Sequence, residues 1–266
     1  MSGAAMSDLH RIETRELSSL SATTHDDRLA ALILACILTA FAVFAIWPEI
    51  DLRVSQAFYD HSKGFVIDGN PLTEALRMAV WNVSILLCLV AVFGTFLGAA
   101  GREVILPARV WGFVVALYTL GPGVMVEMLT KPLWGRVRPT QVTEFGGSLH
   151  FSPPNELADF CARNCSFVSG EVSGATVTAL AILLIRFHLG KRMSKMVSIL
   201  LLVVTLCLPL AVASQRIAAG RHFLSDTLFA VLFTLLLALA LSALFRPLSR
   251  RVPSARPRQS AVPTDH

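Results

Sequence analysis

Residues 197–244 read VSILLLVVTLCLPLAVA, then SQRIAAGRHFLSD, then TLFAVLFTLLLALALSAL, which is a short polar segment between two apolar runs. A helix rises about 1.5 Å per residue, so roughly 17 to 20 apolar residues cross the hydrocarbon core of a bilayer. Residues 197–213 and 228–244 meet this length. We therefore predict two transmembrane helices here, with the polar residues 214–226 held at one membrane surface.

Four further apolar runs precede this pair. They cover residues 29–47, 78–99, 110–129 and 172–184, and the last reaches spanning length only if Gly170 and Glu171 form its first turn. Charged residues make up only 15% of the chain, and the mean hydropathy is +0.63. Soluble domains carry roughly 25% charged residues. The sequence therefore predicts an all-α fold, an integral membrane bundle of six transmembrane helices over residues 29–245.

The two ends of the chain differ from this domain. Residues 1–28 are polar, with Ser/Thr clusters and without the apolar core of a signal peptide, so the first apolar run reads as a retained anchor. Residues 246–266 are basic and contain four prolines. We expect a flexible cytoplasmic segment before the domain and a disordered cytoplasmic tail after it.

The positions of the basic residues predict the orientation. Six spans place both termini on one side, and that side collects 14 of the 23 Lys and Arg residues. Because loops rich in Lys and Arg stay cytoplasmic, the termini are predicted to be cytoplasmic and residues 214–226 to lie on the non-cytoplasmic side. The basic residues form short clusters between apolar runs, so the net charge of +5 indicates anionic lipid headgroups rather than nucleic acid as the partner.

Polar residues gather in three clusters on the non-cytoplasmic side, at residues 131–139, 165–171 and 214–226. Three of their cations, Lys131, Arg138 and Arg216, lie in the first and third of these clusters. Cations that converge from separate helices suit a phosphoryl group, whereas a lone arginine at this depth would more often reach toward headgroups. Ser169 and Gly170 open a helix, and the free N–H groups at a helix N-terminus bind anions.

His222 and Asp226 are the candidate reaction centre. They are four residues apart, so on a helix they would share a face and could touch. A carboxylate in that position fixes the tautomer of the imidazole and leaves the other ring nitrogen free to act as a nucleophile. The alternative is a structural histidine at the interface.

Cys161 and Cys165 lie in the long non-cytoplasmic loop, four residues apart. In an oxidising compartment they could close a small disulfide before Ser169, and the alternative is two free thiols. Two cysteines without a companion His or Cys make an incomplete zinc site, so no metal site is predicted.

The order and spacing of these motifs resemble the type 2 phosphatidic acid phosphatase (PAP2) superfamily over residues 29–245. The matching elements are Lys131 with Arg138-Pro139, then Ser169-Gly170, then Arg216 with His222 and Asp226. The resemblance implies a phosphatase without metal or cofactor, in which His222 forms a phosphohistidine and Asp226 orients it. It also implies that the phosphate oxygens are held by a set of five groups: Lys131, Arg138, Arg216, the Ser169 hydroxyl and the Gly170 N–H.

One position departs from the family pattern. Members usually carry a histidine after Ser-Gly, which protonates the leaving group, but this chain has Glu171. Glu171 could be an acid whose pKa is raised in a partly dry setting, although nearby Lys and Arg would lower it. It could instead position substrate or water for a leaving group that departs with little help. A third reading is a catalytically weakened relative.

The motif Cys-Ser-Phe-Val-Ser-Gly-Glu at residues 165–171 is similar to that of a subgroup of bacterial lipid phosphatases that act on lipid A. The expected substrate is therefore lipid A, at its 1- or 4′-phosphate. Undecaprenyl diphosphate and phosphatidylglycerol phosphate are alternatives, and a non-catalytic phospholipid-binding or transport protein is an alternative of another class. The oligomeric state is left open by the sequence.

Overall fold

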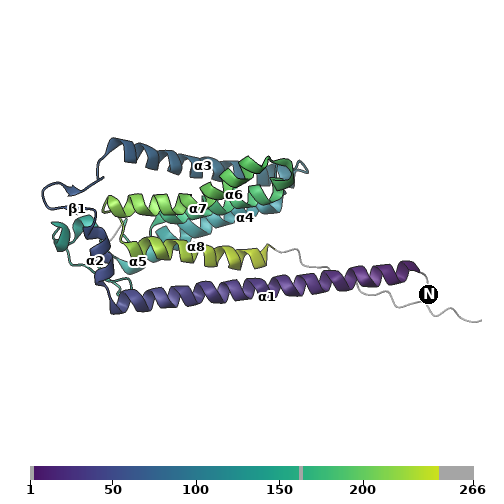
Figure 1. Cartoon of the computed structure of the whole chain (residues 1–266), viewed down its shortest axis with the longest axis horizontal. Coiled ribbons are helices and arrows are strands. Elements are labelled where there is room, and N and C mark those ends of the chain that lie inside the picture. The colour runs from purple at the N-terminus through teal and green to yellow at the C-terminus, as the bar shows by residue number, and fades with distance from the viewer. Residues whose placement is uncertain (1–2, 162–163, 246–266) are drawn as a thin grey trace, which may run out of the picture.

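The computed structural model describes residues 3–161 and 164–245, and it is almost entirely helical (Figure 1). Six helical stretches in this part of the chain are long and apolar enough to cross a membrane, which confirms the predicted fold class. They are α1 (Gly3–Ile46), α3 (Pro71–Ala99), the continuous series α4 (Ala108–Tyr118), η1 (Thr119–Thr130) and α5 (Lys131–Trp134), then α6 (Gly170–Leu189), α7 (Lys195–Ala218) and α8 (Leu224–Leu244).

The short elements fill the connections. Helix α2 (Glu49–Gln56) and the two-stranded hairpin of β1 (Tyr59–Asp60) and β2 (Gly64–Phe65) lie between α1 and α3. The turns η2 (Pro139–Gln141) and η3 (Thr143–Phe145) follow α5, and η4 (Gly190–Arg192) joins α6 to α7. Helices α2 and α5 and strand β1 gather at one end of the bundle, on the left of Figure 1. That end carries the candidate site.

The first helix is longer than predicted. Helix α1 runs from Gly3 to Ile46 and extends well past the other helices (Figure 1), and the flexibility expected of residues 1–28 stays a prediction. Its apolar part, His25–Ile46, is the candidate span. The basic tail predicted at residues 246–266 lies outside the described residues.

Helix α3 also begins earlier than the apolar pattern indicated, at Pro71 instead of residue 78. The side chain of Asn70 caps it by accepting hydrogen bonds from the N–H groups of Leu72 and Thr73, at 3.0 and 3.2 Å. An Asn cap followed by proline at the first helical position is a favourable helix start. The earlier start places Glu74 and Arg77 on the helix, next to the candidate site.

Helix α6 is the centre of the bundle. Half of its apolar window is buried, more than in any other span, and it contacts α3, α4, η1, α7 and α8. Its buried face includes small residues such as Ser173, Ala175 and Ala179, which allow neighbouring helices to approach closely. Because α6 is fixed on several sides, its first residues, Gly170 and Glu171, are held in place at the site. This start of α6 agrees with the sequence prediction.

Candidate active site

His222 lies in the turn between α7 and α8 and is only 4% exposed. The turn depends on Gly220, which has a φ of +63° and on which a Cβ would collide with the Phe65 ring. The predicted shared helical face of His222 and Asp226 is wrong, because α8 begins only at Leu224. Phe223 is the N-cap residue and Asp226 accepts its N–H at 2.7 Å, so the carboxylate closes the first turn of α8.

The carbonyl oxygen of Ser166 fixes the tautomer of His222. It lies 2.8 Å from Nδ1, while the Asp226 carboxylate lies 3.7 Å from the same nitrogen. A carbonyl oxygen only accepts hydrogen bonds, so Nδ1 carries the proton and donates it. The second ring nitrogen, Nε2, is therefore unprotonated in the neutral ring and available as a nucleophile.

Burial lowers the pKa of His222 below its ordinary value, and the nearby charges of Arg138 and Lys131 act in the same direction. The Asp226 carboxylate opposes this shift. Desolvation disfavours the charged imidazolium, so the ring is kept neutral, which is the form that can attack phosphorus.

Asp226 acts on His222 through Ser166. Its Oδ2 accepts the Ser166 hydroxyl at 2.5 Å, and this hydrogen bond holds the residue whose carbonyl faces the imidazole. The direct orienting contact predicted between Asp226 and His222 is thus mostly indirect in the structure. Ser166 was not singled out from the sequence, although it lies within the second polar cluster.

Arg136 holds Asp226 from the other side. It is fully buried, and its Nη1 donates to Asp226 Oδ1 at 2.6 Å. Its Nη2 donates to Asp51 Oδ2 at 2.8 Å, and its Nε donates to the Ser152 carbonyl at 2.7 Å. Asp51 also accepts from the N–H of Ser225 at 2.8 Å. Burying three charged groups costs desolvation energy, and the ion pairs and hydrogen bonds of this network oppose that cost.

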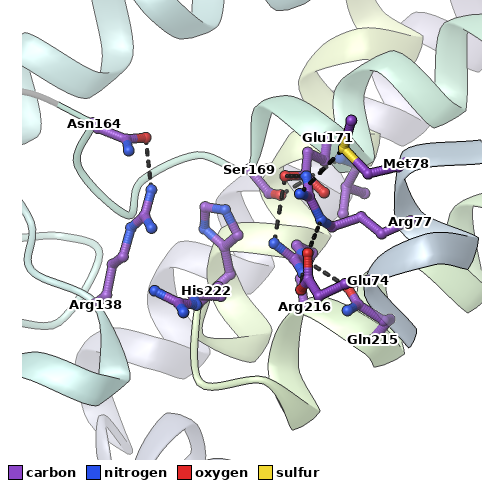
Figure 2. Close-up of polar contacts among 12 residues, drawn as sticks. Glu74, Arg77, Met78, Arg138, Asn164, Ser169, Glu171, Gln215, Arg216 and His222 are labelled. Carbon is purple, nitrogen blue, oxygen red and sulfur yellow. Dashed lines mark hydrogen bonds and ion pairs between the residues drawn. The ribbon is translucent and has the colours of Figure 1, made fainter. Parts of the chain in front are cut away.

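The predicted phosphate-binding groups converge on this end of the bundle. Lys131 is buried and pairs with Glu127 one turn earlier, while Arg138 donates to Asn164 at 2.6 Å (Figure 2). A Cβ on Gly170 would lie 3.8 Å from the Lys131 ammonium, so the start of α6 and this lysine are neighbours. Ser169 is also buried, but its hydroxyl caps α6 by accepting the N–H of Val172 at 3.4 Å.

The structure joins Cys161 and Cys165 in a disulfide. Asn164 lies inside this small loop, where it has a φ of +55° and accepts the hydrogen bond from Arg138. The loop therefore presents an amide oxygen to a cation of the site.

Glu171 belongs to a group of four charged side chains with Glu74, Arg77 and Arg216 (Figure 2). Its Oε1 lies 3.2 Å from Arg77 Nη1 and 3.4 Å from Arg216 Nη1. Glu74 contacts the same two arginines, with Arg77 Nε at 2.6 Å and Arg216 Nη2 at 3.3 Å. Glu171 and Glu74 thus hold both guanidinium groups between them. This geometry supports the positioning reading of Glu171.

Two cavities meet at His222. The larger, of about 530 Å³, runs between the helices along an apolar wall that includes Trp81, Ile85, Leu89, Tyr118 and Pro122. The smaller, of about 310 Å³, is polar, and its wall includes Asp68, Glu74, Asn164, Arg216 and Arg221. Their shared wall consists of Arg77, Arg138, Asn164, Glu171 and His222. The site can thus hold an amphiphile whose charged group lies at the junction.

The sequence is similar to those of known proteins. The sequence profile of the PAP2 superfamily matches residues 110–250. The chain is 31% identical to the lipid A 4′-phosphatase of Rhizobium leguminosarum over 218 residues, which cover 76% of this chain and 90% of that protein. The chain belongs to the PAP2 superfamily. The lipid A 4′-phosphatase of Francisella tularensis subsp. novicida is 30% identical over 210 residues, which cover 76% of this chain and 90% of that protein.

A solved PAP2 structure shows the same fold. The transmembrane PAP2-type phosphatidylglycerolphosphate phosphatase of Bacillus subtilis superposes with a TM-score of 0.54 and 17% sequence identity. The match covers 84% of this chain and 98% of that structure. The predicted family and enzyme class are therefore confirmed: this PAP2 protein is a multi-pass membrane phosphatase, a phosphoric ester hydrolase.

Proposed function

We propose that this PAP2 phosphatase removes the 4′-phosphate of lipid A through a phosphohistidine on His222. The observation that carries the chemistry is the hydrogen bond of His222 Nδ1 to the Ser166 carbonyl, which leaves Nε2 unprotonated beside both cavities. The choice of the 4′-phosphate over the 1-phosphate rests on two relatives that carry the name lipid A 4′-phosphatase.

In the first step, the lone pair of Nε2 attacks phosphorus and the bond to the sugar oxygen breaks. The ring becomes a cation, which the Ser166 carbonyl at 2.8 Å and the Asp226 carboxylate at 3.7 Å stabilise. Lys131, Arg138 and Arg216 neutralise the equatorial phosphate oxygens. In the second step, water attacks the phosphohistidine, releases inorganic phosphate and restores the neutral ring.

The leaving group at the 4′ position is a sugar alkoxide, which is poor unless its charge is neutralised. Arg77 and Arg216 flank Glu171 at the position where other members of the superfamily carry their acid histidine. Their positive charges stabilise the developing alkoxide, which takes its proton from water. Glu171 keeps the two guanidinium groups in place. This role corresponds to the positioning reading of Glu171.

The larger cavity supports a lipid substrate. Its apolar wall joins Lys131, Gly170 and His222 at one end to Trp81, Ile85 and Leu89 of α3, which are partly exposed on the outer surface of the bundle. An acyl chain in this cavity places its headgroup phosphate at His222. We assign this end of the bundle to the periplasmic face and the termini to the cytoplasm, on the strength of the Lys and Arg bias.

The test is phosphate release by the purified protein from lipid A that carries both phosphates, with mass spectrometry of the product. The expected product has lost the 4′-phosphate and kept the 1-phosphate, and His222→Ala forms none. A product that has lost only the 1-phosphate would overturn the assigned position. Equal phosphate release by wild type and His222→Ala would overturn the mechanism.

A further inference from the structure

Three carboxylates contact the cations that are assigned to phosphate binding. Glu74 and Glu171 both contact Arg216, at 3.3 and 3.4 Å, and Glu127 pairs with Lys131. Arg216 is 6% exposed, and its Nη1 and Nη2 atoms donate to Glu171 and Glu74. A substrate phosphate has to replace the carboxylates as the partner of Arg216.

This replacement leaves acceptors without donors. Once Arg216 turns to the phosphate, Glu74 keeps Arg77 Nε at 2.6 Å but loses the donor on its other oxygen. The carboxylate then faces a phosphate dianion, and like charges at short range oppose binding. A partly buried acceptor that loses its donor is also costly. A substrate that brings hydrogen-bond donors beside its phosphate removes both penalties.

The smaller cavity lies where hydrogen-bond donors of the substrate, next to its phosphate, would be. It shares His222, Arg77, Arg138, Asn164 and Glu171 with the larger one, so a group attached to the phosphate can enter it directly. Its remaining wall adds the acceptors of Glu74 and Asp68. A volume of about 310 Å³ is near the lower end of ligand cavities, which span roughly 300–1,000 Å³.

We infer that the smaller cavity is a headgroup subsite for a hydroxyl-bearing sugar, and that Glu74 is the specificity-determining residue in it. Glu74 accepts a hydrogen bond from the sugar that carries the scissile phosphate. Lipid phosphates without such donors, such as phosphatidic acid or polyprenyl phosphates, leave the carboxylate unpaired and bind poorly. A site built to hydrogen-bond a hydroxyl discriminates strongly against the analogue that lacks it. The inference rests on the proposed function and adds the residue that reads the sugar.

The experiment compares two lipids in the same detergent micelles. One is an acylated glucosamine 4-phosphate with its remaining ring hydroxyls free, and the other is the same lipid with those hydroxyls replaced by hydrogen. The measured quantity is the ratio of kcat/KM for the two lipids within each protein sample, so partial misfolding of a variant cancels. The proteins are wild type, Glu74→Met, Glu74→Gln and, as the control, Glu144→Gln, an exposed carboxylate outside both cavities.

Wild type should prefer the hydroxylated lipid roughly 10- to 100-fold, the range for one hydrogen bond to a charged group. Glu74→Met should lose this preference, Glu74→Gln should keep part of it through the amide oxygen, and Glu144→Gln should keep all of it. An unchanged preference in Glu74→Met, or no preference in wild type, would overturn the subsite while the phosphatase assignment stands. Failure of wild type to hydrolyse either lipid would overturn the proposed function, and the subsite with it.

Discussion

Replacement of Arg136 by methionine should destabilise the protein more than any exposed substitution, because it leaves two buried carboxylates unpaired. Arg136, Asp51 and Asp226 are each 0% exposed, and the two ion pairs are 2.8 and 2.6 Å long. Removal of one partner from a buried ion pair costs about 3–5 kcal/mol. For a chain of this size, that corresponds to a fall in Tm on the order of 10 °C.

The Arg136→Met substitution should also lower the catalytic activity. Without Arg136, Asp226 no longer has a fixed position, so Ser166 and the tautomer of His222 are less well defined, and turnover should fall. A double variant, Arg136→Met with Asp51→Asn, removes one unpaired carboxylate and should recover part of the stability. Arg53→Met is the matched control, because this arginine is exposed and lies 4.0 Å from Glu49. Such surface pairs contribute roughly 0–1 kcal/mol.

The assay is thermal unfolding in detergent, run in parallel with phosphate release from the folded fraction. If Arg136→Met unfolded within about 2 °C of wild type and kept full turnover, the network would hold neither the fold nor Asp226. If the double variant were no more stable than Arg136→Met, unpaired charge would not be the cause of the lost stability.

Three further predictions follow from the site. Burial lowers the pKa of His222, so its neutral, nucleophilic form persists below the ordinary histidine pKa of about 6.5. The fall of kcat/KM in acid that is due to His222 should therefore occur below about pH 6.5. An NMR titration that places the pKa of the ring above about 7 would contradict this. Gly174→Leu should lower turnover of long-chain lipid roughly tenfold or more yet spare a soluble phosphate monoester, because a Cβ there meets nothing within 4 Å and points into the apolar cavity. Equal losses on both substrates would argue against an acyl chain in that cavity. Glu171→Gln should cost less than about tenfold in kcat, whereas loss of a true general acid costs about 10²–10⁴, and a loss in that range would restore the proton-donor reading.

The helices could be predicted from local sequence, but some of their ends could not. Apolar runs longer than a bilayer is thick specify transmembrane helices by themselves, and all six predicted spans coincide with helices of the structure. The start of α3 was missed because Glu74 and Arg77 interrupt the apolar pattern, although Asn70 followed by Pro71 is a cap signal in the sequence.

Some residues of the site could likewise be predicted from the sequence, and others could not. Residues read from motif spacing, among them Lys131, Arg138 and Gly170, lie with His222 around the larger cavity. The network behind His222 could not be read, because Arg136 meets Asp51 and Asp226 across separations of 85 and 90 residues. The sequence signal for this network was Arg136 itself, an additional arginine between Lys131 and Arg138 in the first polar cluster.

The central claim is that His222 becomes phosphorylated. Lipid A labelled with ³²P at the 4′-phosphate is mixed with the purified protein and quenched in alkaline detergent within the first turnover, and the labelled peptide is identified. A phosphohistidine should be stable in alkali, labile in acid, located on His222 and absent from His222→Ala. Label on another residue, or phosphate release by His222→Ala at the wild-type rate, would contradict the account.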